Sequence, residues 1–197
     1  MDSQLSFLAR PADLPEGLRY HPDFLDADEE AALAAYIAAQ ALKPFEFQGF
    51  LGKRRTVSFG WHYAFDGSGL RETEPIPDWL LPVRERAAAF AGVEPEALQH
   101  VLLIEYASGA GIGWHRDRPA FGDVVGISLL AEARIRFRRK AGNKWERKAL
   151  IAAPRSAYLL TGPARSEWEH SIPAMEMLRY SITFRTLAPQ PWRSPPL

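Results

Sequence analysis

The pattern of hydrophobic and polar positions predicts two helices in the first half of the chain. The first lies within FLDADEEAALAAYIAAQAL at 24–42, where Asp26 or Asp28 can cap the start and acidic residues fill the first turn before a run of alanine and leucine. The second covers 78–91, with Asp78 as its candidate N-cap and a glycine directly after it as the stop signal.

Beyond residue 99 the pattern changes to short apolar runs that glycine, proline and asparagine interrupt. The predicted strands are 100–106, 124–130, 133–139, 145–150, 156–161 and 178–186. The AGN sequence at 141–143 fits a hairpin turn between two of them. Short strands at this spacing predict a β-sandwich or barrel flanked by helices. The proline-rich tail at 188–197 predicts no regular structure.

Composition narrows the class of protein. A chain of 197 residues with 47% apolar and 24% charged residues is expected to form one globular domain. No apolar run reaches the roughly 18 residues of a membrane span, and no signal peptide is expected at the start. Cysteine is absent, so we expect a cytoplasmic protein without disulfide-linked partners, whose metal ligands must be His, Asp or Glu.

The formal net charge is zero, which argues against a strongly basic, non-specific nucleic-acid binder. A local basic segment nevertheless occupies 134–148. Its cations are Arg134, Arg136, Arg138, Arg139, Lys140, Lys144, Arg147 and Lys148, against Glu146 alone. These side chains are either solvated or form a wall that contacts phosphates of DNA or RNA. We expect the protein to be a monomer.

The last predicted strand contains RYSITFR, in which polar and apolar residues alternate. Arg179, Ser181, Thr183 and Arg185 share one face, because strand side chains alternate between the two faces of a sheet. This pattern fits a half-exposed edge strand with solvated arginines. It also fits a concave face on which an arginine binds a carboxylate through two parallel N–H bonds.

The GWHRDRP sequence at 113–119 contains a candidate metal-binding pair. His115 and Asp117 point to the same side of an extended segment, and a third ligand from a distant segment would complete one face of a metal site. His170 is a candidate, although a lone histidine is more often structural. Two imidazoles and a carboxylate suit non-heme Fe(II), but zinc hydrolases use the same ligand types.

The combination of these residues favours iron. An arginine nine residues after His170 adds a carboxylate-binding group, which a metal site with a keto-acid co-substrate needs and a zinc peptidase does not. At this point the sequence resembles the AlkB family of Fe(II)- and 2-oxoglutarate-dependent dioxygenases. The resemblance lies in EYASGAGIGWHRDRP at 105–119, EWEHSIP at 167–173 and RYSITFR at 179–185, in this order and spacing.

The resemblance implies a mainly β, α+β fold: a double-stranded β-helix (jelly roll) at about 99–187, with N-terminal helices and a substrate lid at about 1–98. It implies that Fe(II) is bound by the triad His115, Asp117 and His170. It further implies that four residues contact or hold 2-oxoglutarate: Tyr106, Arg179 at the distal carboxylate, Ser181, and Arg185 near the other end.

The implied reaction uses O₂ to convert 2-oxoglutarate to succinate and CO₂ while a substrate C–H bond is oxidised. An N-methyl group would become hydroxymethyl and leave as formaldehyde. Two positions depart from the pattern of the DNA-repair members. Ile104 stands where they commonly have asparagine, and Pro119 where they often have an acidic residue close to the target base.

The segment KRRTVSFGWHYAFDG at 53–67 resembles part of the family's nucleotide-recognition lid. Phe59, Trp61, Tyr63 and Phe65 recur at period two, which places them on one strand face, either as core or as a stacking surface for a flipped base. The predicted substrate contacts are Trp61, Tyr63, Arg55 and Arg116.

Alkylated DNA or RNA is thus the expected substrate, undergoing oxidative dealkylation. The alternatives are a 2-oxoglutarate-dependent hydroxylase or demethylase of a protein side chain or small molecule, and a non-catalytic jelly-roll binding module.

Overall fold

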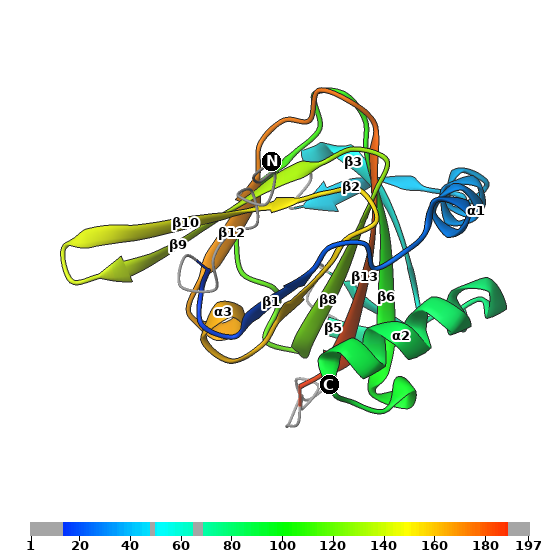
Figure 1. The fold of residues 1–197 in the computed structure, drawn as a ribbon, viewed down its shortest axis with the longest axis horizontal. Helices are drawn as coiled ribbons and strands as arrows, with labels where there is room; N and C mark the ends of the chain where they lie inside the picture. The colour runs from blue at the N-terminus through cyan, green and yellow to red at the C-terminus, as the bar shows by residue number, and fades with distance from the viewer. Residues whose placement is uncertain (1–13, 48–49, 65–68, 189–197) are drawn as a thin grey trace, which may run out of the picture.

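The computed structural model describes residues 14–47, 50–64 and 69–188. Two antiparallel sheets form most of the fold (Figure 1). The larger sheet has the order β1 (Leu18–His21), β11 (Ala157–Leu160), β8 (Phe121–Leu129), β13 (Arg179–Leu187), β6 (Leu98–Tyr106), β3 (Phe50–Phe59) and β2 (Lys43–Phe47). The smaller sheet has the order β10 (Lys144–Ala152), β9 (Ala133–Ala141), β12 (Glu169–Ile172) and β7 (Ile112–His115).

The larger sheet is covered on both faces. On one face, Leu103, Ile127 and Phe184 pack in a cluster with apolar side chains of the two long helices, such as Ile37 and Val83. On the other face, a second cluster joins the two sheets, and it includes the following residues: Tyr106, Val124 and Tyr158 of the larger sheet, and Ile135, Phe137 and Ile172 of the smaller one. This sandwich is the jelly roll that the sequence predicted.

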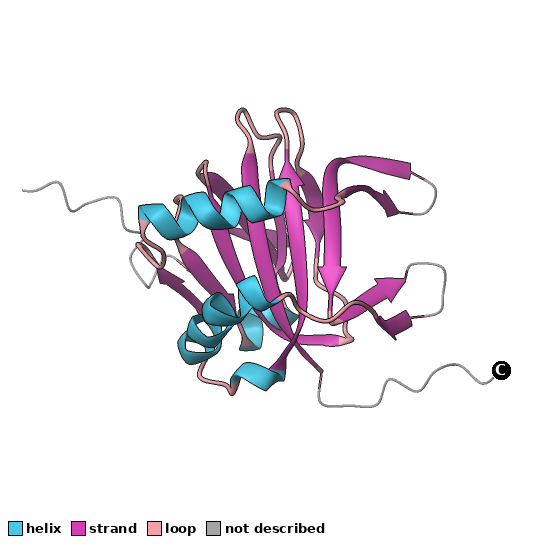
Figure 2. Cartoon of the chain, turned by 90° about the vertical axis from the view of Figure 1, so that its right-hand side faces the viewer, coloured by secondary structure: helices cyan, strands magenta, loops and turns pink. Residues whose placement is uncertain are grey.

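Figure 2 shows the two long helices, α1 (Ala27–Ala38) and α2 (Leu81–Ala91), lying against the larger sheet. The other helical segments are the short α3 (Gly162–Ser166) and 3-10 turns at Asp78–Leu80 and Pro95–Ala97. None of the helices in the described segments is long and apolar enough to cross a membrane.

Local signals at the helix ends were mostly correct. Asp26 accepts from the backbone N–H of Glu29, and the Glu29 side chain accepts from the N–H of Asp26, which completes a capping box. Gly92 ends α2 at φ 78°, in the left-handed region. The predicted cap at Asp78 is wrong, because this residue begins a 3-10 turn and α2 starts at Leu81 without a side-chain cap.

The six strands predicted beyond residue 99 are confirmed within a few residues at each end. The turn at 141–143 is confirmed as well, with Gly142 at φ 60°. The aromatic run is not one strand, because Gly60 takes φ 77° between β3 and the separate β4 (Trp61–Ala64). β4 pairs only with β5 (Gly69–Glu72) in a two-stranded sheet. Phe65 lies outside the described residues.

The sequence analysis placed a boundary near residue 98, between an N-terminal substrate lid and the catalytic core. In the structure β1, β2 and β3 belong to the same sheet as β6, β8 and β13, so the N-terminal part contributes strands as well as helices.

The capping box gives a stability prediction. Asp26→Ala removes the acceptor for the N–H of Glu29 and should lower the free energy of unfolding by about 1 kcal/mol in urea titrations. Asp28→Ala is the matched control, since Asp28 is an acidic residue of the same turn without the capping contact. Equal losses in the two variants would show that only charge near the helix terminus matters.

Candidate active site

Two neighbouring strands of the smaller sheet bring together the three predicted metal ligands. His115 ends β7 and is the direct register partner of His170 in β12. Their ring centroids lie 4.2 Å apart. Asp117 follows β7 by two residues, and its Oδ2 lies 3.9 Å from Nε2 of His170. Side chains 55 positions apart in sequence therefore converge on one point between the sheets.

The three side chains lie close together but do not form a complete metal-coordination site. Across the described segments, no three His, Cys, Asp or Glu side chains are arranged as a complete metal-binding group. One oxygen of Asp117 faces His170 and the other accepts from Arg185, so the carboxylate is shared between the two. The assignment of His115, Asp117 and His170 as ligands therefore stays a prediction, which their proximity supports.

The electrostatics around Asp117 keep it ionised. Burial alone would raise the pKa of Asp117, but Arg185, His170 and His115 outweigh burial and hold the pKa well below its usual range. Arg185 donates from Nε and Nη2 to Oδ1 of Asp117 at 3.2 and 2.8 Å. The Nη1 of Arg185 lies 3.4 Å from Nδ1 of the buried His100, so His100 also contacts this guanidinium.

Both histidines are held in the neutral form that binds metal. Burial, with a smaller contribution from His115, lowers the pKa of His170 to about 3, although Asp117 acts in the opposite direction. Burial also lowers the pKa of His115. Nδ1 of His115 lies 2.9 Å from the carbonyl oxygen of Gly113. When Nδ1 donates to that carbonyl, Nε2 carries the free lone pair.

Arg179 is fully buried, and most of its guanidinium has no partner. Its Nε donates to Oγ of Ser128 at 2.9 Å, whereas Nη1 and Nη2 have no hydrogen-bond partner among the described residues. A buried, unpaired cation is costly, so its two free donors fit an anion that arrives from outside the chain. A carboxylate matches their parallel geometry. The arrangement fits the distal carboxylate of 2-oxoglutarate.

The edge-strand interpretation of RYSITFR is excluded by the sheet order. β13 lies between β8 and β6, and its even-numbered side chains enter the cluster under the helices. The odd-numbered Arg179, Ser181 and Arg185 are therefore turned toward the smaller sheet, and all three are buried. Arg179 is also the register partner of Tyr106, whose ring centre lies 5.1 Å from its Cζ.

A small cavity of about 40 Å³ connects these groups. It is lined by Tyr106, Ile112, His115, Asp117, Val124, Tyr158, Leu160, His170, Ile172, Thr183 and Arg185. The predicted metal ligands and two of the predicted co-substrate residues, Tyr106 and Arg185, thus share one cavity, with Arg179 beside Tyr106.

Three residues near this cavity were not in the predicted set. Tyr158 contributes a buried hydroxyl whose pKa burial raises to about 12, so it remains a neutral donor. Ser128 orients Arg179. A Cβ on Gly126 would overlap the Tyr158 ring, so glycine leaves room for that side chain. Nothing in the sequence separates Tyr158 from an ordinary core tyrosine, because its role depends on which strands are neighbours.

The substrate-side residues are only partly grouped. Trp61 and Tyr63 lie half-buried on β4, and Arg118, the residue after Asp117, lies over the Tyr63 ring at 5.3 Å. Arg55 points elsewhere and forms two hydrogen bonds of 2.7 Å with Glu105. Arg116 is exposed and donates to the backbone carbonyl of Ser166 at 3.2 Å.

The two departures differ in position. Ile104 is buried in the cluster between the sheets, and Pro119 is exposed. Arg54, the neighbour of Arg55, lies over the Phe45 ring, with its Cζ 3.9 Å from the ring centre. Burial lowers the pKa of Arg54.

Comparison with known proteins identifies the class. The sequence matches the 2OG-Fe(II) oxygenase superfamily over residues 17–185, and the chain belongs to this family. Fe(II), 2-oxoglutarate and O₂ are therefore the cofactor and co-substrates of its chemistry.

Proteins named as AlkB homologues are among its relatives. The chain is 29% identical over 181 residues to "Alkylated DNA repair protein ALKBH8 homolog" of Arabidopsis thaliana, covering 80% of this chain and 51% of that protein. It is 33% identical over 111 residues to "Probable RNA/DNA demethylase ALKBH6" of Danio rerio, covering 56% and 45%. The chain thus spans about half the length of these relatives.

Solved structures agree on the fold. The structure of OsALKBH1 superposes with a TM-score of 0.66 at 16% identity, covering 86% of this chain and 96% of that one. A prolyl-4-hydroxylase from Pseudomonas putida gives 0.59 at 17% identity, covering 88% and 94%. At such identities the likeness shows the fold alone.

The buried histidines give a pH prediction. Because burial disfavours the charged imidazole, His170 in the metal-free protein should stay neutral from pH 8 down to about pH 5. Its ring resonances, assigned by comparison with His170→Gln, should not shift over this range in NMR spectra. A titration step of this ring between pH 5 and 8 would contradict the burial of the site.

Proposed function

We propose that the chain removes alkyl groups oxidatively from nucleobases in DNA or RNA, with His115, Asp117 and His170 as the Fe(II) ligands. The observation that carries the catalytic part is the buried guanidinium of Arg179: its two Nη groups have no hydrogen-bond partner among the described residues, and it lies beside Tyr106, which lines the same cavity as the His–Asp group. A non-catalytic binding module has no need for this costly arrangement.

Each polar residue of the cavity has a separate proposed role. Arg179, oriented by Ser128, binds the distal carboxylate of 2-oxoglutarate, with the hydroxyls of Tyr106 and Tyr158 as further donors in the cavity. Arg185 holds Asp117 in place through two hydrogen bonds. Ser181 shares the buried face of β13 with both arginines. Bound Fe(II) and 2-oxoglutarate supply the chemistry that uses O₂ to oxidise a substrate C–H bond.

The overall reaction balances for an N-methyl substrate. One O₂ and one 2-oxoglutarate give succinate, CO₂ and an N-hydroxymethyl group, which then releases formaldehyde and leaves an N–H on the base. Neutral histidines and an ionised Asp117 suit this reaction near neutral pH, since no ligand must lose a proton first.

Two lines of support point to a nucleobase. The names of two relatives describe repair of alkylated DNA and probable RNA/DNA demethylation. The half-buried Trp61 and Tyr63 on β4 offer flat rings near the loop that follows Asp117. The exposed Arg116 is proposed to contact the nucleotides beside the target base. Arg55 is instead paired with Glu105, and this ion pair links β3 to β6.

The first prediction concerns the co-substrate. Arg179→Ala should weaken 2-oxoglutarate binding by at least about a hundredfold, because about 1.5–3 kcal/mol is typical of a hydrogen bond to a charged group and two are lost. Calorimetry with Fe(II) or Mn(II) bound checks this value. Metal affinity should stay the same. A parallel loss of metal binding would make Arg179 a structural residue, and Arg179→Lys, which keeps the charge but not the two parallel donors, should fall between.

The second prediction concerns the substrate. The wild-type protein with Fe(II) and 2-oxoglutarate should release formaldehyde from N-methylated oligonucleotides and not from N-methylated peptides. His115→Ala should abolish both formaldehyde and succinate. Turnover with peptides or small molecules, and none with oligonucleotides, would replace this proposal with a protein or metabolite oxygenase on the same site.

A further inference from the structure

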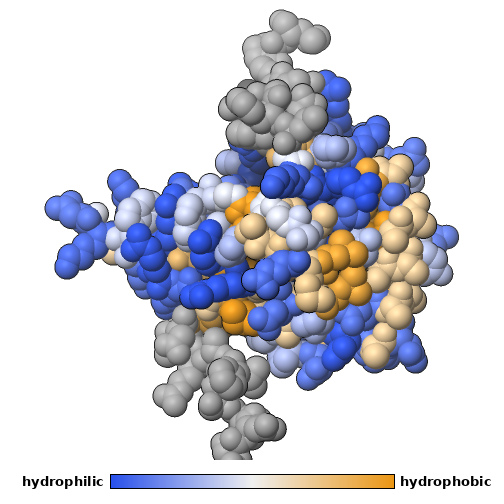
Figure 3. Space-filling model, turned by 90° about the horizontal axis from the view of Figure 1, so that it is seen from above, coloured by the Kyte–Doolittle hydropathy of each residue, from blue (hydrophilic) through white to orange (hydrophobic). Residues whose placement is uncertain are grey.

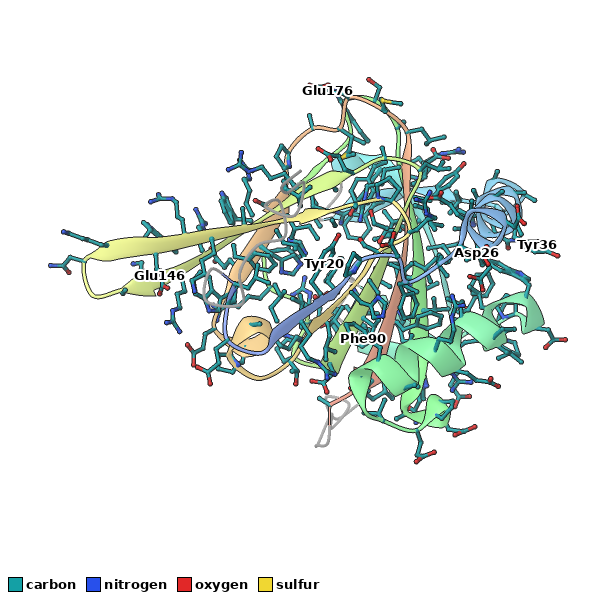
Figure 4. The ribbon with its side chains drawn as sticks, viewed as in Figure 1. Tyr20, Asp26, Tyr36, Phe90, Glu146 and Glu176 are labelled. Carbon is teal, nitrogen blue, oxygen red and sulfur yellow. The ribbon has the colours of Figure 1, made fainter. Side chains whose placement is uncertain are left out.

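The β9–β10 hairpin extends well beyond the rest of the smaller sheet. Figure 1 shows it projecting from the body at the left, and Figure 3 shows the same end, seen from above, as largely hydrophilic. The hairpin pairs over its whole length, from Ala133↔Ala152 to Ala141↔Lys144. Figure 4 shows side chains ending in nitrogen along both strands, with Glu146 labelled near the tip.

Strand alternation divides the hairpin into two faces. Ile135 and Phe137 are buried and face the larger sheet, so the even-numbered residues of β9 face outward. The register adds the residues of β10 that lie opposite them. The outer face consists mainly of Arg134, Arg136, Arg138 and Lys140 on β9, Trp145, Arg147, Ala149 and Ile151 on β10, Trp114 on β7, and Glu169 on β12. We call these residues the basic outer face.

Indole rings hold one of its arginines in place. The Cζ of Arg138 lies 4.4 Å from the ring centre of Trp114 and 4.4 Å from that of Trp145. Arg136 lies over Trp114 at 5.1 Å, and Lys140 over Trp145 at 5.8 Å. The guanidinium between two indoles keeps its outward N–H donors in a fixed orientation before any partner binds.

The charge on this face is not neutralised within the described chain. Glu169 is its one carboxylate and already pairs with Arg138 at 2.6 Å. Arg134 and Arg147 are exposed, and no ion pair to either is found in the described segments. A protein of zero net charge therefore concentrates five cations on one small surface together with two tryptophans.

Cations alternating with aromatic rings on an open sheet face suit one class of partner. A single-stranded nucleic acid offers phosphates at regular spacing for the cations, and unpaired bases that stack on indole rings. The same strands carry His115 and His170 on their inner face, and β7 is the edge of the sheet. A single-stranded nucleic acid that places one base in the cavity can therefore continue past β7 onto the basic outer face.

We propose that the basic outer face binds single-stranded DNA or RNA beside the nucleotide that enters the active site. That the bound nucleic acid is the enzyme's substrate rests on the proposed function. The binding of nucleic acid to this face does not depend on it. Binding on this face needs no metal, no 2-oxoglutarate and no alkylated base.

The experiment measures fluorescence anisotropy of an unmodified single strand of roughly 16 nucleotides at several salt concentrations. Arg134→Ser with Arg147→Ser should weaken binding about tenfold and reduce the magnitude of the salt slope by roughly 1.4, at about 0.7 for each lost phosphate contact. Trp145→Ala should also weaken binding roughly tenfold but leave the salt slope unchanged, because it removes stacking and no charge.

Matched controls separate this face from general electrostatics. Arg19→Ser with Lys43→Ser removes two exposed cations from β1 and β2 of the larger sheet and should not alter binding. Arg134→Lys with Arg147→Lys should keep the salt slope. Equal weakening by both serine pairs, or none by Arg134→Ser with Arg147→Ser, overturns the proposal. So does equal competition by poly-glutamate, or equal recruitment to anionic vesicles.

Succinate formation without any strand is measured in each variant to show that the active site is intact. If the wild type binds the strand through this face but releases no formaldehyde from methylated strands, the proposed function fails and the binding surface stands. If formaldehyde is released while the face variants bind normally, the reverse holds.

Discussion

The burial of two arginines inside a β-sandwich is the constraint on which the rest of this molecule depends. β13 runs through the centre of the larger sheet and places Arg179 and Arg185 on its inner face. A charge in such a place requires a partner. Arg185 has one in Asp117, which fixes the loop after β7 against the sheet. Within the described residues Arg179 has one hydrogen-bond partner, Ser128, and its two remaining Nη groups suit an anion from outside the chain.

The same ion pair links the electrostatics to the metal chemistry. Arg185 keeps Asp117 charged in a place where burial alone would favour the neutral acid. The ionised carboxylate then lies beside two imidazoles that burial keeps neutral. Each group therefore holds the protonation state that a ferrous ligand needs, and the sheet provides this before any metal arrives.

Membership of the oxygenase family establishes the type of reaction but not the substrate. The fold is shared with OsALKBH1 and with a prolyl-4-hydroxylase, so the jelly roll alone does not determine the substrate. We therefore expect substrate selection to depend on three parts outside the core: β4 with its aromatic rings, the loop after Asp117, and the outer face of the smaller sheet. These parts are built from surface residues that the core does not constrain.

Patterns that depend on near neighbours could be recognised without coordinates. The capping residue Asp26, the end of α2 at Gly92, the turn at Gly142 and the long strands beyond residue 99 all follow from local backbone preferences and alternation. The short β7 and β12 were missed, since four residues carry too little periodicity. Asp78 failed as a cap because a 3-10 turn precedes α2.

The roles of individual polar residues needed the folded chain. The sequence predicted anion-binding roles for both Arg179 and Arg55, but Arg179 is buried with two unpartnered Nη groups and Arg55 is paired with Glu105 across two strands. Spacing along the chain therefore established the residue types, their order and the chemistry they allow. Which charges remain unpaired, and where they face, depended on contacts between segments far apart in sequence, because only the packing of the two sheets determines which groups lose their water.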